Sequence, residues 1–281
     1  MVVNGLVLFL LMFVCLYPMI HILAASLSDP SLIAAHRGLL FFPLSFSVES
    51  YKMVFENPYI ISSYANTIVY VVVGTLLNLV LTSFAAYALS RRQNPVKAIV
   101  MKLITFTMYF SGGLVPTYML INSLGLADTR WVMIIPGAVS AYNLIIMRTF
   151  FTGIPVAMEE SAKIDGANDF IVLLKIFTPL AKPVIAVMAL FYGVAHWNAW
   201  FDASLYIQNR SLLPLQVILR EILIENTTQN MITAVDSADK MMVSQTVKYA
   251  TIIVATVPIL ALYPFLQKYF VKGVMIGSIK E

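Results

Sequence analysis

The chain has 281 residues, of which 60% are hydrophobic and only 11% are charged, and its mean hydropathy is +0.84. A soluble domain carries about 25% charged residues, so this composition excludes an ordinary water-facing surface and predicts a lipid environment. The net charge of +4 is typical of a membrane protein with basic cytoplasmic loops. No basic run is interleaved with aromatic residues, which argues against a nucleic-acid partner.

The first apolar stretch, residues 5–27, is long enough to cross a bilayer core of about 30 Å. Its small residues Ala24, Ala25 and Ser26 also suit a signal-peptide cleavage site. No Lys or Arg precedes the stretch, however, and it exceeds a normal signal core, so we predict a retained helix. The missing basic flank further predicts that the native chain begins earlier. The single cysteine, Cys15, is expected to be a small apolar packing residue.

An outer loop and two more spans follow the first one. Residues 28–62 are rich in turn formers, and we expect a short interfacial piece over residues 41–55 of this loop. A second span is predicted over residues 64–89, ending at the basic turn 90–95. A third is predicted over residues 99–121.

A helix break is predicted near the middle of the third span. Ser111, Gly112, Gly113 and Pro116 stand there, and glycine and proline both interrupt helices. Backbone groups freed inside a bilayer are tolerated only against protein or a water-filled cavity. We therefore expect the break to lie on protein or to line a pathway.

Three further spans are predicted over residues 131–151, 184–207 and 246–270. Two outer segments are predicted over residues 122–130 and 208–245. Six spans place both termini on one side of the membrane. The predicted fold class is therefore all-α, a polytopic membrane protein with about six transmembrane helices. We expect one transmembrane domain over residues 1–281, without an obvious internal repeat.

The loop between the fourth and fifth spans, residues 152–182, carries mixed charge in an otherwise apolar chain. Pro155 suits the first turn of a helix, where its missing N–H is no loss. Glu159 and Glu160 follow within about a turn and complement the positive end of the helix dipole. We predict a helix from Pro155, then a bend and a second short helix that is stopped by Pro179 and Pro183.

Small residues are spaced to share one face of this predicted helix. Ser161 and Asp165 are four residues apart, as are Ala162 and Gly166. Short side chains let another surface approach a helix backbone closely. Gly166 is also the expected site of the bend.

The distribution of basic residues predicts the orientation of the chain. Most of the 18 Lys and Arg residues fall on the side of the 152–182 loop, including Arg91, Arg92 and Lys97. Basic loops face the cytoplasm, so we expect this loop, both termini and the tail over residues 271–281 to be cytoplasmic.

The chain carries no pattern typical of a catalytic site. It has no Gly-x-x-x-x-Gly-Lys-Ser/Thr phosphate loop, and His21, His36 and His196 are too scattered for a metal site. No serine elbow or carboxylate pair stands in a plausible pocket. We therefore predict no catalytic residues, no metal and no cofactor in this chain, so any energy for transport must come from a partner.

A polar and aromatic stretch in the outer half of the fifth span is the candidate substrate pathway. Ionisable and amide groups at that depth are expensive and indicate a pathway, and aromatic rings can cover the face of a sugar. Trp and Tyr also gather at every outer interface, so an aromatic belt with Asp202 as a cap is the alternative. The candidate residues are Tyr192, His196, Trp197, Asn198, Trp200 and Asp202.

The 152–182 loop resembles the EAA loop of binding-protein-dependent ABC importer permeases. That pattern is Glu-Ala-Ala, three residues to Gly, nine more, then Ile-x-Leu-Pro. Here Ser161 replaces an Ala and Thr178 replaces the Leu, with Gly and Pro in register. The resemblance implies a coupling helix that docks into the ATPase subunit through Glu159, Glu160, Ser161, Ala162, Asp165, Gly166, Ala167, Ile176 and Pro179.

The rest of the chain looks like the carbohydrate-uptake branch of this family. The stretch 196–202, the loop 214–216 and the tail 272–277 are most similar to permeases of alginate and aldouronate importers, and more distantly to the smaller maltose-importer permease. The resemblance implies a type I permease fold in the bacterial cytoplasmic membrane. It also implies that residues 273–281 reach the ATPase, although the ending Lys280-Glu281 differs from the usual Lys-Gly.

The same resemblance implies the partners of the chain. These are a second homologous permease, two ATPase subunits that bind ATP and Mg, an extracytoplasmic solute-binding protein and a carbohydrate, with an acidic oligosaccharide of the alginate or aldouronate type as the expected class. We therefore interpret the chain as a non-enzymatic permease subunit that works by alternating access. A stand-alone secondary carrier or channel is the alternative, and a membrane scaffold is a third reading. An importer permease should copurify with an ATPase, whereas a carrier should purify alone.

Overall fold

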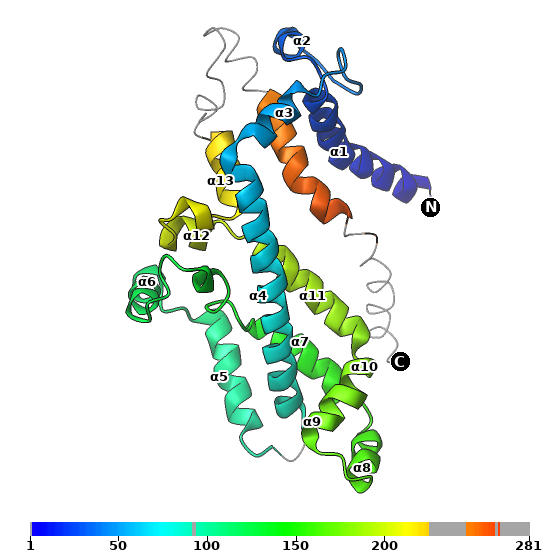
Figure 1. Ribbon diagram of the computed structural model, residues 1–281. Coiled ribbons are helices and arrows are strands. Elements are labelled where there is room, and N and C mark those ends of the chain that lie inside the picture. The colour runs from blue at the N-terminus through cyan, green and yellow to red at the C-terminus, as the bar shows by residue number, and fades with distance from the viewer. Residues whose placement is uncertain (1, 92–93, 225–245, 262–263, 265–281) are drawn as a thin grey trace. The chain divides into compact units, whose positions relative to one another are not determined.

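The computed structural model describes residues 2–91, 94–224, 246–261 and 264 (Figure 1). Within them the regular elements are helices, apart from an isolated antiparallel bridge between Ser28 and Phe46. The predicted all-α class is therefore confirmed. The predicted cytoplasmic tail, 271–281, lies outside the described residues, as does most of the outer segment 208–245.

The chain divides into two compact units. The first comprises residues 1–66 and 213–261, and the second comprises residues 67–212 and 262–281. The boundary falls within helix α4 (Pro58–Ser90). The single permease domain expected over the whole chain stays a prediction.

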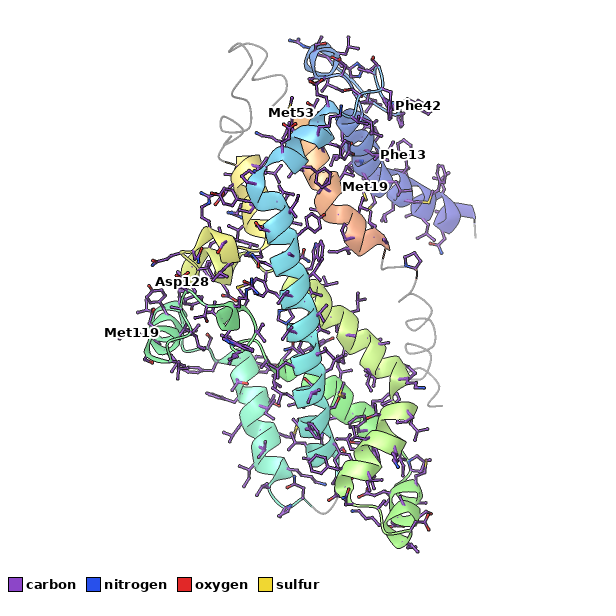
Figure 2. The ribbon with its side chains drawn as sticks, viewed as in Figure 1. Phe13, Met19, Phe42, Met53, Met119 and Asp128 are labelled. Carbon is purple, nitrogen blue, oxygen red and sulfur yellow. The ribbon has the colours of Figure 1, made fainter. Side chains whose placement is uncertain are left out.

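The first unit holds the predicted outer loop and the first span. Its elements are α1 (Val2–Ser26), α2 (Pro30–Ala35), α3 (Glu49–Glu56), the start of α4, α13 (Leu215–Ile224) and a helix over Thr246–Ala261. Along α1, apolar side chains such as Phe13 and Met19 are exposed, as a lipid-facing helix requires (Figure 2). The expected interfacial piece is only partly helical, because α3 begins at Glu49.

Helix α4 starts six residues before the predicted second span. The Oδ1 of Asn57 accepts a hydrogen bond from the backbone N–H of Tyr59 at 2.9 Å, and Pro58 is the first helical residue. An Asn cap followed by Pro is a strong helix start, because the cap satisfies a free N–H and Pro lacks one. These two residues explain why the helix begins in what was expected to be loop.

The second unit holds the rest of α4 and a series of shorter helices. They are α5 (Lys97–Tyr109), α6 (Leu114–Ser123), η1 (Arg130–Met133), α7 (Ala141–Thr152), α8 (Val156–Ile164), α9 (Asp169–Val172), the π turn η2 (Leu173–Phe177), α10 (Thr178–Leu180), α11 (Lys182–Trp197), α12 (Phe201–Tyr206) and η3 (Arg210–Leu212). Its core lies where α4, α7 and α11 meet. Phe177 is buried there, with its ring centroid 5.1 Å from that of Tyr87 and 5.5 Å from that of Phe151.

Of the helices in the described ranges, α1 and α4 are each long and apolar enough to cross a membrane alone. Up to five spans result if each bent helix pair counts as one. The break predicted in the third span is confirmed, since α5 and α6 meet at 116° and Gly113 has a φ of +89°. The expected sixth span, 246–270, is described only as Thr246–Ala261 and Pro264.

The fourth and fifth spans are not the single helices that the sequence suggested. In the fourth, non-helical residues 134–140 separate η1 from α7. Pro136 explains this break, because it has no N–H to donate and its ring clashes with the preceding turn. In the fifth, α11 ends at Trp197 and α12 begins only at Phe201. The predicted pathway stretch therefore straddles a helix end.

Candidate functional site

The predicted helix and bend of the 152–182 loop are confirmed. Helix α8 begins directly after Pro155 and ends in a Schellman motif at Gly166, whose φ is +83°. The N–H of Gly166 donates to the carbonyl of Lys163 at 3.1 Å, and the N–H of Ala167 donates to the carbonyl of Ala162 at 2.9 Å. Glycine favours this left-handed position because it has no Cβ, so the sequence folds locally into a sharp, well-defined turn.

The residues expected on one docking face of α8 divide between two faces. Ala162 and Ala167 pack against the buried core of the second unit, as does Ile176 from the π turn. Glu160, Ser161 and Asp165 are exposed. The open face of this segment is therefore made by Glu160, Ser161, Asp165 and Gly166, while the alanines fix the segment to the protein.

A large apolar side chain that the sequence reasoning missed also lies on this segment. Ile164 is 86% exposed at the last helical position of α8, directly before the turn. An isolated exposed apolar residue is common on proteins, but this one stands beside exposed Asp165 and Gly166 at the turn that ends α8. The sequence did carry a signal for Ile164, because it stands two residues before Gly166, the expected site of the bend.

Arg91, at the end of α4, fixes α8 in place. Its guanidinium forms an ion pair with Glu159 and donates to the backbone carbonyl of Phe151 at 3.2 Å. It also lies 4.3 Å from the centre of the Phe177 ring, within cation–π range. The side chains of Arg91 and Glu159 are only 15% and 12% exposed. One arginine thus joins α4, α7, α8 and the π turn.

Lys163 and Asp169 extend this ionic cluster across the bend. The Nζ of Lys163 lies 2.8 Å from Oε1 of Glu159 and 3.2 Å from Oδ1 of Asp169. The hydroxyl of Tyr87 donates to the same Asp169 oxygen at 3.2 Å. Helices α8 and α9 are therefore held to each other and to α4 by charged groups.

Contacts within the cluster favour the charged forms of Glu159 and Lys163. Burial alone would raise the pKa of Glu159, but hydrogen bonds from Lys163 and Arg91 outweigh burial and hold that pKa below its usual value. The hydrogen bond to Glu159 raises the pKa of Lys163. The stability from Glu159 is lost only as pH falls through its lowered pKa, and that from Lys163 only as pH rises through its raised pKa.

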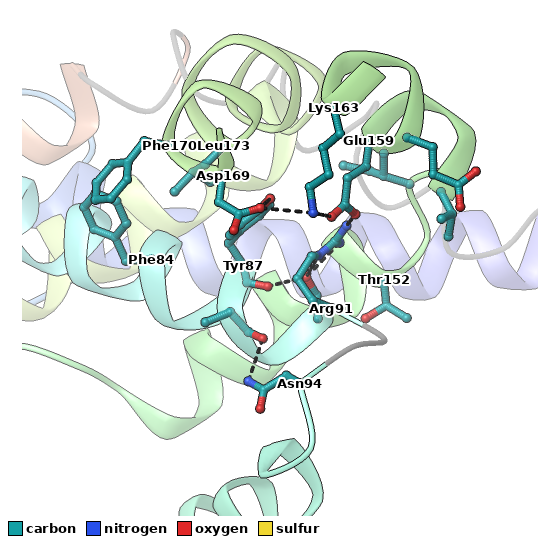
Figure 3. A pocket seen from close by; sticks show the side chains of 15 residues that line it. Phe84, Tyr87, Arg91, Asn94, Thr152, Glu159, Lys163, Asp169, Phe170 and Leu173 are labelled. Atoms are coloured by element: carbon teal, nitrogen blue, oxygen red, sulfur yellow. Dashed lines mark hydrogen bonds and ion pairs between the residues drawn. The ribbon is translucent and has the colours of Figure 1, made fainter. Parts of the chain in front are cut away.

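A pocket of about 580 Å³ opens beside this cluster (Figure 3). Its walls combine the charged side chains of Arg91, Glu159, Lys163 and Asp169 with the apolar ring of Phe170. The ring of Phe84 lies 5.6 Å from that of Phe170, which closes one side. Glu160, which the sequence placed on the docking face, also lines this pocket.

The second helix of the loop is irregular, and it ends at Leu180, between Pro179 and Pro183, which were predicted to stop it. The chain passes from α9 through the π turn into α10, which carries Pro179 in its first turn. Pro179 has no N–H for the carbonyl of Lys175, four residues earlier, so regular α-helical bonding fails here. The segment 169–180 then meets α11 at 85°.

The six candidate pathway residues do not form one cluster. Tyr192, His196 and Trp197 are buried on α11, whereas Asn198 and Asp202 are exposed and Trp200 is half-buried beyond its end. The Nε2 of His196 lies 2.7 Å from Oδ1 of Asn78 on α4. Their role as sugar contacts stays a prediction. Within the described ranges, no group of three His, Cys, Asp or Glu residues could hold a metal ion.

Arg91 and Asn78 are the main residues that sequence reasoning missed. Arg91 was identified only as part of a basic turn, although Tyr87 stands four residues before it, at the spacing of neighbours on a helix. Asn78 carried no signal beyond being an amide inside an apolar span, which indicates a functional role by default.

Comparisons with known proteins identify the family of the chain. The chain is 42% identical over 274 residues to the polygalacturonan/rhamnogalacturonan transport system permease protein YtcP of Bacillus subtilis (strain 168), covering 97% of this chain and 96% of that protein. It is also 42% identical over 269 residues to protein LplC of the same organism, covering 95% and 90%. No protein-family model matches the chain.

A solved structure gives the same result for the fold. The chain matches a bacterial ABC transporter involved in the import of the acidic polysaccharide alginate, with a TM-score of 0.87 and 32% sequence identity over 96% of this chain and 95% of that one. With its broken spans and its helix–bend–helix loop, the chain therefore has the fold of a transporter permease. The chain belongs to the family of sugar ABC importer permeases.

Proposed function

We propose that this protein is a transmembrane subunit of a binding-protein-dependent ABC importer for acidic oligosaccharides. The observation that carries the substrate class is the similarity to two transporters whose names specify acidic polymers, a polygalacturonan/rhamnogalacturonan system and an alginate importer. The complete transporter would contain a second homologous permease, two ATPase subunits and an extracytoplasmic solute-binding protein. The ATPase subunits would bind ATP and Mg, and this chain would carry no catalytic residue.

The mechanism follows from the 152–182 loop. With that loop and both termini in the cytoplasm of a bacterial cell, the open face of α8 would dock on an ATPase subunit. Closure of the ATPase pair would then move α8, and with it the helices to which Arg91 and the ionic cluster bind it. The two permeases would switch between inward-facing and outward-facing states. ATP would bias this equilibrium through its differential affinity for the two states.

The exposed Ile164 supports the docking step and gives a direct test of it. Burying one Ile side chain at an interface contributes about 1.5–3 kcal/mol, so Ile164→Asp is expected to weaken ATPase binding at least tenfold. The measurement is the amount of ATPase that copurifies with the permease in detergent. Ile164→Met, which keeps an apolar side chain of similar size, is the matched control. Unchanged ATPase recovery with Ile164→Asp would show that α8 does not dock through this face.

The substrate class is tested with the complete complex in liposomes together with its binding protein. We expect oligogalacturonates or alginate oligosaccharides to stimulate ATP hydrolysis at least fivefold, and neutral maltodextrins of the same length to have little effect. Stimulation by neutral sugars alone would contradict the acidic class. Sugar uptake by the permease without any ATPase would favour the alternative, a stand-alone carrier.

A further inference from the structure

The helix break at residues 134–140 is held by a side chain from the middle of α4. Asn78 is fully buried, and its Nδ2 donates to the carbonyls of Gly137 at 2.7 Å and Ala138 at 2.8 Å. Both carbonyls belong to the segment that Pro136 keeps out of a helix. A broken helix inside a bilayer needs partners for its freed backbone groups, and Asn78 supplies them.

His196 orients the amide of Asn78. Carbonyl oxygens only accept, so the Nδ2 of Asn78 must face the break and its Oδ1 must face His196. The Nε2 of His196, 2.7 Å away, then donates to that Oδ1. The imidazole lies against the backbone of α4 at Gly74, where a Cβ would stand 2.4 Å from Nε2. Only glycine at this position leaves room for the ring.

Tyr192 makes a second tie at the other end of the break. Its hydroxyl accepts from the N–H of Ser140 at 3.2 Å and lies 2.7 Å from Oγ1 of Thr82 on α4. Ser140 in turn caps α7, accepting from the N–H of Asn143. The middle of the break is therefore bound directly to α4 through Asn78, and its end at Ser140 is linked to α4 through Tyr192 of α11.

The same helix carries the link to the coupling segment. Arg91, which pairs with Glu159 of α8, is thirteen residues after Asn78, or about 20 Å along the helix at 1.5 Å per residue. Helix α4 thus holds the cytoplasmic segment at one point and the intramembrane break at another. A continuous helix between two tight attachments moves both together.

We propose that α4 is the rod that carries movement of α8 to the break at residues 134–140, and that Asn78 and His196 are the positioning residues that attach the break to it. The proposal rests on the proposed function in one respect, that an ATPase moves α8. It assigns a transmitting role to polar groups in the membrane rather than a sugar-binding one. His196 and Tyr192, candidates for the pathway, act on the break instead of on the sugar.

The test uses a cysteine probe in the break. Val139 is 44% exposed, and the only native cysteine is Cys15, so Val139→Cys in a Cys15→Ala background provides a single reporter. The complete complex is treated with a water-soluble maleimide, without nucleotide and after trapping with ATP and vanadate. We expect the labelling rate to differ at least fivefold between these states. No difference in this parent complex would overturn the proposal, since the break would then not follow the ATPase.

Removing the attachment of the break to Asn78 should abolish the difference in labelling rate between the two nucleotide states. Asn78→Leu is expected to bring the two labelling rates within twofold while the ATPase still copurifies. Ser83→Ala, on the same helix but away from the break, should keep the fivefold difference. A fivefold difference that persists in Asn78→Leu would overturn the proposal.

A second pair of variants keeps the test decisive if Asn78→Leu does not fold. His196→Gln retains an N–H that can reach Asn78, so we expect it to keep most of the difference in labelling rate. His196→Phe keeps a ring but has no donor, so we expect it to lose that difference. Equal behaviour of the two would reduce the histidine to a packing role and contradict the proposal. If labelling responds to nucleotide but no acidic sugar stimulates hydrolysis, only the proposed substrate is wrong.

Discussion

Replacing Arg91 with alanine is expected to lower both binding-protein-stimulated ATP hydrolysis and sugar uptake at least tenfold. The change removes the ion pair with Glu159, the hydrogen bond to the Phe151 carbonyl and the contact with the Phe177 ring. Hydrogen bonds to charged groups contribute about 1.5–3 kcal/mol each, and the pair is largely shielded from solvent. Within the ionic cluster, movement of α8 would then reach α4 only through the remaining contacts of Lys163 with Asp169 and of Asp169 with Tyr87.

Two further variants separate this mechanical role from simple loss of charge. Arg91→Lys keeps the charge but not the planar fork that reaches several acceptors at once, so an intermediate activity is expected. Arg91→Ala combined with Glu159→Gln should be little worse than Arg91→Ala alone, with a coupling energy on the order of 1–2 kcal/mol in a double-mutant cycle. Additive losses would mean that the two residues act separately. Full stimulation in Arg91→Ala would refute the role of Arg91.

Replacing Gly166 with tryptophan is expected to reduce stimulated ATP hydrolysis to less than a tenth of the parent value. With a φ of +83°, any side chain there adds strain of about 1–2 kcal/mol. More importantly, a Cβ at Gly166 would meet nothing within 4 Å, so the indole would project into open space beside Ile164. That space is where the ATPase subunit is expected to dock.

Gly166→Asn is the matched control, because asparagine tolerates the left-handed conformation and is small. We expect it to keep at least half of the stimulated activity, measured in proteoliposomes that contain equal amounts of assembled complex. If Gly166→Trp and Gly166→Asn fail equally, backbone strain is the cause rather than blocked docking. If Gly166→Trp hydrolyses ATP and transports normally, the 152–182 loop is not the coupling element.

The features that the sequence alone determined are those set by neighbouring residues. Pro155 and Gly166 fixed the start and end of α8, because proline suits the beginning of a helix and glycine suits the left-handed turn after one. The break between α5 and α6 followed from Gly112 and Gly113 in the same way. Composition alone indicated the membrane, since so few charges could not cover a surface in water.

Which side chains meet depends on the packing of whole helices. Arg91 and Glu159 are 68 residues apart, and Asn78 and His196 are 118 apart, so no local spacing predicts either contact. The same packing placed Ala162 against the core and buried His196 beside Gly74, which no local pattern in the sequence indicates. Local conformation depends on interactions within a few residues, whereas burial and pairing depend on how whole helices pack, and a single sequence does not contain that arrangement in readable form.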